Sequence, residues 1–215
     1  MIEEILEAAR ASRFDFREHA CPADPSRGEH AEQVPCYRLQ QGISRVLKPQ
    51  SVLQLDCRYG YGALALLRGH PALRLHGFDP NCGETAGALD WARRITHGGR
   101  ADFAEGGIEQ LERFGDELFV LILLRAQPDG DLSWREIEPA TRFARWVAIE
   151  GYYDPACKAA FLAANEFLHR FRQDIDAVHL LPEPHAHLLF APSPRLHHAP
   201  PEEDFHAGRR SSAEL

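Results

Sequence analysis

The stretch "SVLQLDCRYGYGALALL", Ser51–Leu67, decides the fold of this chain. Its first five residues are mostly branched or apolar, which predicts a strand inside a sheet. Gly60 and Gly62 then mark a tight turn, and the apolar run that follows predicts a helix over 63–69. In doubly wound α/β sheets such a turn brings backbone N–H groups and a helix N-terminus towards a ligand.

The same alternation of strand and helix continues along the chain. The hydrophobic pattern predicts further strands over 73–78, 101–104, 118–124 and 146–149, and helices over 84–95, 134–143 and 155–171. Repeated units of this kind imply a parallel sheet with helices on both faces. The segments 177–181 and 187–191 have no room for a helix between them and should pair antiparallel. We therefore expect an α/β, Rossmann-like, doubly wound seven-stranded sheet, mostly parallel with an antiparallel C-terminal hairpin.

Three regions follow from this pattern. Residues 1–48 combine an amphipathic helix at the start, a polar stretch without a period over 14–34 and a helix over 37–47, which together predict a cap or lid. Residues 49–192 hold the predicted sheet and its helices. Residues 193–215 include "PPEEDFHAGRRSSAEL" and are predicted to be a disordered tail.

Composition limits the classes of protein and partner. The chain has 215 residues, 44% of them hydrophobic, and a formal net charge of -8, which indicates one globular domain and argues against a nucleic-acid partner. The longest apolar run, 118–124, is too short to span a bilayer and the first residues do not resemble a signal peptide, so we expect no membrane partner and a cytoplasmic location. The five cysteines form no C-x-x-C pair, which favours reduced thiols over disulfides or a structural zinc site.

Two features around the predicted turn indicate a nucleoside-bearing ligand. Gly60 lies in the turn, and "LHGFDPN" places Asp79 at the end of the next strand, where an acid can accept hydrogen bonds from both hydroxyls of a ribose. The alternative is that Gly60 only allows tight packing and that Asp79 caps the following helix.

The sequence resembles class I S-adenosylmethionine-dependent methyltransferases. The resemblance is to the branch whose first motif reads like E-I-G-x-R-Y-G-Y-S, where this chain has "QLDCRYGYG", 54–62, followed by G-x-D at Gly77 to Asp79. "FAEGGIEQL", 103–111, resembles the segment that faces the adenine. The resemblance implies S-adenosylmethionine as cofactor, bound by Gln54, Asp56, Arg58, Gly60, Tyr61, Asp79 and Gly106.

Two residues of the first motif depart from the family pattern. Gln54 replaces the usual acid, and Asp56 replaces the first glycine. A carboxylate at Asp56 is expected to crowd or repel the cofactor's own carboxylate, unless it pairs with the amino group instead.

The catalytic part of the resemblance is incomplete. The family's D-G-D-H-S-Y-like segment here reads "DGDLSW", so Leu132 replaces the histidine base and cannot move a proton. "AIEGYYD" supplies Glu150, with Gly151 in place of a second acid. Asp129 and Glu150 are therefore the candidate catalytic residues and the candidate ligands of Mg²⁺, although two carboxylates would leave most of the Mg²⁺ shell to water and substrate.

Other ionisable residues have structural and functional interpretations. His185 and His187 lie two apart, which suits metal ligation on a strand, but a solvated hairpin turn is the preferred interpretation. His19 and His30 would reach a substrate if the polar stretch is a lid, and otherwise form a solvent-exposed pair. Asp154 before Pro155 is expected to cap a helix, the alternative being a substrate contact.

The predicted function is methyl transfer from S-adenosylmethionine to a small molecule, with an O-methyltransferase of secondary metabolism as the form that the resemblance suggests. Alignment of the reactants can carry such a transfer without a dedicated base. The alternative is a catalytically degenerate binding or scaffold protein on the same fold. A nicotinamide dehydrogenase is disfavoured because the full G-x-G-x-x-G register is missing, and a homodimer is neither indicated nor excluded.

Overall fold

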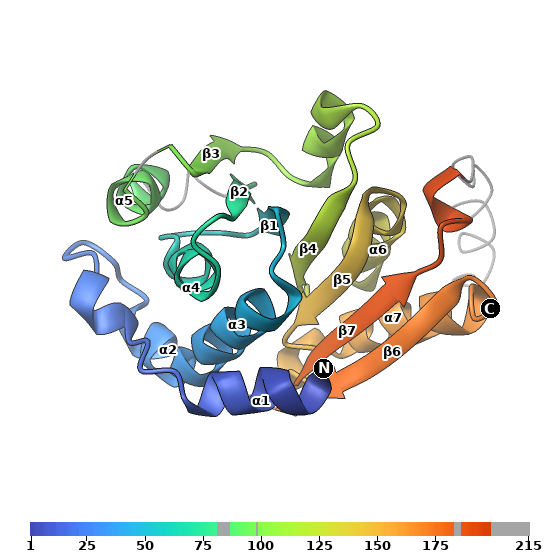
Figure 1. Ribbon diagram of the computed structural model, residues 1–215, viewed down its shortest axis with the longest axis horizontal. Coiled ribbons are helices and arrows are strands. Elements are labelled where there is room, and N and C mark those ends of the chain that lie inside the picture. The colour runs from blue at the N-terminus through green and yellow to red at the C-terminus, as the bar shows by residue number, and fades with distance from the viewer. Residues whose placement is uncertain (81–86, 98, 183–185, 199–215) are drawn as a thin grey trace, which may run out of the picture.

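The quoted stretch folds as the predicted strand, turn and helix. In the computed structural model, which describes residues 1–80, 87–97, 99–182 and 186–198, β1 (Ser51–Leu55) leads through a tight turn into α4 (Tyr61–Gly69) (Figure 1). Four of the five β1 residues are buried, as expected for a strand covered on both faces.

Most predicted elements are present, with small differences at their ends. The remaining helices and strands, with the short 3₁₀ helices written η, are α1 (Ile2–Arg10), η1 (Phe16–His19), α2 (Arg27–Glu32), α3 (Val34–Leu47), β2 (Arg74–Asp79), α5 (Ala88–Ile95), β3 (Ala101–Glu105), η2 (Ile108–Phe114), β4 (Phe119–Arg125), α6 (Gly130–Phe143), β5 (Ala144–Glu150), η3 (Pro155–Cys157), α7 (Lys158–Arg170), β6 (Ile175–Leu181), β7 (His187–Pro192) and η4 (Leu196–His198). The first residues of the predicted helix over 84–95 lie outside the described residues.

The sheet has the predicted topology. Its seven strands lie in the order β3-β2-β1-β4-β5-β7-β6. Strands β1 to β5 are mutually parallel, and β7 runs antiparallel to both β5 and β6. The expected Rossmann-like sheet with an antiparallel hairpin at its end is confirmed.

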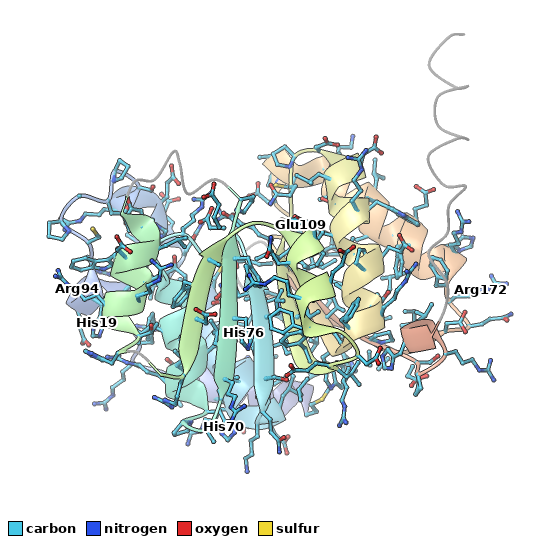
Figure 2. All side chains as sticks on the ribbon, turned by 90° about the horizontal axis from the view of Figure 1, so that it is seen from above. His19, His70, His76, Arg94, Glu109 and Arg172 are labelled. Atoms are coloured by element: carbon cyan, nitrogen blue, oxygen red, sulfur yellow. The ribbon has the colours of Figure 1, made fainter. Side chains whose placement is uncertain are left out.

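Helices cover both faces of the sheet (Figure 1). Helices α6 and α7 and the η2 segment pack on one face, where Leu53 and Ile149 belong to the same apolar cluster. Helices α1, α3 and α4 pack on the other face, with Val52 and Ala148. His76 of β2 lies on the sheet beside η2 (Figure 2), with its ring 4.8 Å from that of Phe114. Successive residues of each strand therefore face opposite helical layers.

The segment expected to be an aperiodic loop is instead packed. Residues 14–34 include η1 and α2, and Phe14 and Phe16 are buried against Tyr37 and Tyr61. His30 is buried at 3% exposure, so its predicted exposure is wrong. His19 is partly exposed, and its Nε2 lies 2.6 Å from a terminal nitrogen of Arg68. The aromatic residues have no helical or strand period, so the pattern alone gave no sign of burial.

The fold continues past the last strand. Leu196 of η4 is buried, and the His197 ring lies 3.1 Å from the carbonyl oxygen of Ala144. The prediction that disorder begins at 193 is wrong for residues 193–198, and the rest of the expected tail lies outside the described residues. None of the described helices has the length and apolar character needed to cross a membrane.

Candidate functional site

The candidate site lies where the parallel strands end. Because β1 to β5 are parallel, their carboxyl ends meet at one edge of the sheet, which is where ligands bind in this architecture. Asp79, Glu105, Arg125 and Glu150 are the last residues of β2, β3, β4 and β5. The antiparallel β7 begins at the same edge, with His187.

The turn after β1 has a strained backbone. Asp56, Arg58 and Gly60 have φ angles of 52°, 43° and 77°, the left-handed region that favours glycine. A Cβ on Gly60 would lie 2.6 Å from Cβ of Ala92. Glycine at this position is therefore required by the turn and by close packing on α5, in agreement with the packing alternative for Gly60.

Asp79 ties this turn to the neighbouring strand. Its side chain is buried at 1% exposure, and one carboxylate oxygen accepts the backbone N–H of Arg58 at 2.8 Å. Its carbonyl oxygen accepts the N–H of Gly106, whose φ is 137°. Asp79 and Gly106 thus lie together at the ends of β2 and β3.

Asp56 lies in an ion-pair network. Its carboxylate is 3.3 Å from Nε of Arg58 and 3.4 Å from a terminal nitrogen of Arg125, and its side chain is only 9% exposed. Burial alone would lower the pKa of Arg125, but the carboxylates of Glu150 and Asp56 raise it above its usual value. Sequence reasoning missed Arg125, although an arginine that ends the apolar strand "FVLILLR" at the ligand edge was a usable signal.

Glu150 faces the α3 side of this edge. Its Oε2 accepts a hydrogen bond from Nε2 of Gln40 at 2.9 Å. Burial raises the pKa of Glu150, and the positive charge of Arg125 opposes that rise. A carboxylate with a raised pKa is a stronger proton acceptor than an exposed one.

Gln54 is packed against the start of α4. It is 5% exposed, and a Cβ on Gly62 would lie 2.7 Å from Nε2 of Gln54 and 2.6 Å from Oε1 of Gln40. Two glutamines therefore fill the space beside Gly62 on the α3 side.

A polar cavity of about 180 Å³ opens between these groups. It is lined by Gln33, Cys36, Asp56, Arg58, Arg125, Ala126, Gln127, Pro128, Glu150, Gly151, Asp154 and Cys157. A second, smaller cavity of about 20 Å³ shares Asp56, Arg125 and Glu150 with it and is also lined by residues of the α3 side, among them His30, Tyr37, Gln40, Gln54 and Tyr61. The cavity thus holds charges of both signs at the ligand edge of the sheet.

The buried N-terminal segment contributes a chain of polar groups beside this cavity. Nε2 of His30 faces a carboxylate oxygen of Asp24 at 3.4 Å, and Nδ1 lies 2.6 Å from the hydroxyl of Tyr37. Tyr61 donates to the same Asp24 at 3.1 Å and accepts the N–H of Cys21. Burial lowers the pKa of His30, against the opposing charge of Asp24. Tyr61, a predicted cofactor residue, therefore points its hydroxyl at the N-terminal segment.

Asp129 and Leu132 do not take part in this site. One carboxylate oxygen of Asp129 accepts the N–H groups of Asp131 and Leu132, so Asp129 caps α6. It does not line the cavity that Glu150 lines, and Leu132 is 42% exposed. The structure therefore does not support the predicted Asp129 and Glu150 pair of Mg²⁺ ligands.

The remaining predicted residues are also placed. Asp154 accepts the N–H of Ala156 and caps η3, as expected, and it also lines the cavity. His187 is fully buried, so the prediction of a solvated turn is wrong for it, and His185 lies outside the described residues. His187 instead lies beside Glu150 and Cys36.

Comparisons with known proteins agree with the architecture. No protein-family model and no curated protein matches the chain. Among solved structures, a putative caffeoyl-CoA O-methyltransferase from Staphylococcus aureus aligns with a TM-score of 0.61 at 12% identity, covering 83% of this chain and 95% of that one. The SAH-bound methyltransferase PaMTH1 from Podospora anserina aligns with a TM-score of 0.58 at 16% identity, covering 89% and 87%.

A third similar structure has the cofactor bound. The O-methyltransferase TomG from Streptomyces achromogenes, involved in tomaymycin synthesis and solved in complex with SAM, aligns with a TM-score of 0.56 at 17% identity, covering 89% of this chain and 90% of that one. At these identities the likeness shows the fold. The expected resemblance to class I methyltransferases is thus confirmed at the level of the fold.

Proposed function

We propose that this chain, which has the class I methyltransferase fold, transfers a methyl group from S-adenosylmethionine to a small molecule. The observation that carries the proposal is the cavity with charges of both signs at the carboxyl edge of the sheet, directly beside the glycine turn. Similar solved structures described as SAH-bound or in complex with SAM support the choice of cofactor.

The residues around the cavity fit the amino-acid end of this cofactor. That end carries a carboxylate, an ammonium and a sulfonium. The positive charges of Arg58 and Arg125 complement the carboxylate, and the negative charge of Glu150 complements the ammonium and the sulfonium. Asp56 competes with the carboxylate for the two guanidinium groups. Asp79 and Gly106 lie at the strand ends that the resemblance assigns to ribose and adenine. The bound cofactor would supply an electrophilic methyl group on its sulfonium.

Glu150 is the proposed proton acceptor for a hydroxyl of the methyl acceptor. Burial raises its pKa, which makes its carboxylate a stronger proton acceptor than an exposed one, and Gln40 holds that carboxylate in place. Asp129 has no role in this proposal because its carboxylate caps α6. Mg²⁺ does not fit at Glu150, because the neighbouring donors are a thiol and an imidazole rather than the oxygens that Mg²⁺ requires.

The proposal also includes partners and compartment. The formal net charge of -8 and the lack of a longer apolar run than 118–124 favour a small-molecule partner over nucleic acid or membrane. The cytoplasm is the proposed compartment because the five widely spaced cysteines, without a C-x-x-C pair, favour reduced thiols.

Calorimetric titration with S-adenosylmethionine and S-adenosylhomocysteine tests the proposal. We expect micromolar binding to the wild type and a loss of roughly 30-fold in Asp79→Asn, because a hydrogen bond to a charged group contributes about 1.5 to 3 kcal/mol. Asparagine still accepts the N–H of Arg58. Asp102→Asn, at an exposed position of the neighbouring β3, is the matched control and should bind like the wild type.

A scaffold protein on the same fold is the second candidate function. The observation that favours it is the filled space around the turn, where Asp56 pairs with two arginines and two glutamines crowd Gly62. Absence of binding by the wild type to either cofactor form would contradict the methyltransferase proposal and favour this candidate.

A further inference from the structure

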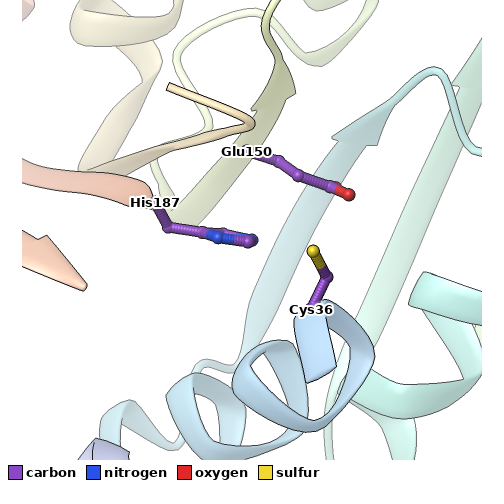
Figure 3. Close-up of side chains that lie close together, drawn as sticks. All are labelled: Cys36, Glu150 and His187. Atoms are coloured by element: carbon purple, nitrogen blue, oxygen red, sulfur yellow. The ribbon is translucent and has the colours of Figure 1, made fainter. Parts of the chain in front are cut away.

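Three side chains with metal-binding donors meet at the wall of the cavity. Cys36, Glu150 and His187 come from α3, β5 and β7, and they point toward one another in Figure 3. Their sulfur, oxygen and nitrogen donor atoms all lie within 4.8 Å of one another. Cys36 and His187 are 3% and 0% exposed.

The pairing of β5 with β7 brings Glu150 and His187 together. The register pairs Val147 with Phe190 and Ile149 with Leu188, so the next step of the ladder sets Glu150 opposite His187. Residues opposite each other in an antiparallel pair project on the same face of the sheet. The alternation of buried residues in both strands makes that face the one covered by α3.

Helix α3 supplies both Cys36 and Gln40, the residue that hydrogen-bonds to Glu150. Cys36 and Gln40 lie four residues apart, so they project from the same face of the helix. Gln40 donates to Oε2 of Glu150 at 2.9 Å and thereby orients the carboxylate. A hydrogen bond of this kind to a carboxylate ligand is a usual outer contact of protein metal sites.

We propose that Cys36, Glu150 and His187 bind a divalent metal ion, with Zn²⁺ as the best match. Thiolate, imidazole and carboxylate are all ligands that Zn²⁺ accepts, whereas Mg²⁺ and Ca²⁺ take oxygen. In a tetrahedral zinc site the donor atoms lie about 3.3 to 3.6 Å apart, so side-chain adjustments of about 1 Å bring these three into range. The site needs neither cofactor nor methyl acceptor, but it shares Glu150 with the proposed function. A Glu150 carboxylate that binds Zn²⁺ is not free to accept a proton, so an occupied metal site would exclude that role, and the metal titration is therefore carried out without cofactor.

The geometry leaves a fourth coordination position on the cavity side. Cys36 and Glu150 line the cavity of about 180 Å³, while His187 closes the site from the sheet. Zinc sites with three protein ligands and one open position are typical of metal ions that meet a substrate or water. The sequence named Glu150 and His187 as candidate metal ligands with other partners, Asp129 and His185. The spacing 36, 150 and 187 resembles no zinc motif, so nothing in it indicated that these two residues meet each other and Cys36.

Titration of the chelator-treated full chain with Co²⁺, followed by displacement with Zn²⁺, tests the site. We expect one equivalent of Co²⁺ to bind, with a thiolate-to-cobalt absorption band and the intense visible bands of tetrahedral cobalt. Cys36→Ser should lose the thiolate band, and Glu150→Gln and His187→Gln should weaken binding by at least about 100-fold, beyond the effect of losing an outer contact. Cys157→Ser removes another buried thiol that lines the cavity and should bind like the wild type.

A thermal melt separates loss of the metal from loss of the fold. Zn²⁺ at 100 times its dissociation constant should raise the Tm of the wild type and of Cys157→Ser by about 5 to 10 °C. The Tm of Cys36→Ser should not rise with Zn²⁺. If His187→Gln does not fold, Glu150→Gln replaces it in this melt, because glutamine has nearly the same shape as glutamate, and its Tm should also stay unchanged. No thiolate band in the wild type, or a band that persists in Cys36→Ser and disappears in Cys157→Ser, would overturn the proposal.

Discussion

The two halves of the carboxyl edge are built differently. On the β2 and β3 side, the geometry comes from the backbone: Gly60 and Gly106 adopt left-handed φ angles, and Asp79 binds a main-chain N–H. On the β4, β5 and β7 side, charged and metal-binding side chains converge from distant parts of the chain, among them Arg125 and Glu150.

The difference shows where this chain keeps the pattern of its fold and where it departs. The β2 and β3 half carries the glycine turn and the acid that the resemblance predicts. The other half lacks the histidine of the family pattern at Leu132 and gains the Asp56 and Arg125 pair. The comparison with solved structures shows the fold, whereas the side chains at the edge differ from the pattern that the resemblance predicts at Asp56 and Leu132.

The largest expected effect concerns a buried carboxyl group of α6, the helix that connects β4 and β5. Glu136 of α6 is 7% exposed, and burial followed by the charge of Asp56 raises its pKa to about 8. The folded chain binds this proton more tightly than the unfolded chain, whose value is 4.5. The stabilising effect is therefore complete below about pH 4.5 and is lost as the pH rises through about 8.

Urea unfolding of the wild type and Glu136→Gln between pH 5 and 9 measures this effect. The variant should become the more stable protein as the pH rises, by up to about 5 kcal/mol, because one pKa unit corresponds to about 1.4 kcal/mol. Glu138→Gln, two residues along the same helix, is the control. Parallel pH curves for wild type and Glu136→Gln would contradict the raised pKa.

The next effect tests the backbone-defined half. Gly60→Ala should destabilise the chain by roughly 3 to 4 kcal/mol, because it adds left-handed strain and a clash with Ala92. Gly99→Ala is matched in φ, at +84°, but meets nothing within 4 Å, so it should lose only about 1 to 2 kcal/mol of stability. Equal losses of unfolding free energy would show that packing on α5 does not explain Gly60.

A smaller loss is expected from the charged network. Arg125→Met leaves the carboxylates of Asp56 and Glu150 without their shared partner and should lower the free energy of unfolding by about 3 kcal/mol. Adding Asp56→Asn should recover part of that loss. Arg145→Met, at an exposed position of β5, should change stability by less than about 0.5 kcal/mol. If Arg125→Met and Arg145→Met have the same free energy of unfolding, the ion-pair network does not stabilise the fold.

The smallest expected effect concerns Asp56, which lies in the turn after β1 and pairs with Arg125 at the end of β4. Asp56→Asn should tighten binding of S-adenosylhomocysteine by roughly tenfold, or about 1.4 kcal/mol, because it releases Arg58 and Arg125 for the ligand's carboxylate. Asparagine tolerates the left-handed φ of 52° at this position. Calorimetric titration measures the affinity of Asp56→Asn and of the exposed control Asp116→Asn, which should bind like the wild type. Weaker binding by Asp56→Asn would mean that Asp56 contacts the cofactor favourably.

The fold was predictable because strand and helix periods are local properties. Short-range patterns located the strands near 51–55 and 118–124, and parallel topology then placed Asp79 and Glu150 at one edge. The candidate site was predicted only where a residue lies directly at a strand end or in the turn after it. Arg125 could have been found by the same reasoning.

The burial of His30 and His187 could not be predicted in this way. His30 lies in a segment without a period, and the partners of its ring, Asp24 and Tyr37, are fixed by packing on α4. His187 faces Cys36 across 151 positions of the chain, a separation that carries no pattern.

The sequence by itself determined the order of strands and helices, the glycine turn and the edge at which a ligand would bind. These follow from the periodicity of apolar residues and from the restricted backbone angles that glycine relieves, both of which act over a few residues. Only the tertiary structure decided that Asp56 pairs with Arg125, and that Cys36, Glu150 and His187 meet. Such contacts depend on register and helix packing between segments far apart in the chain, which local sequence does not encode.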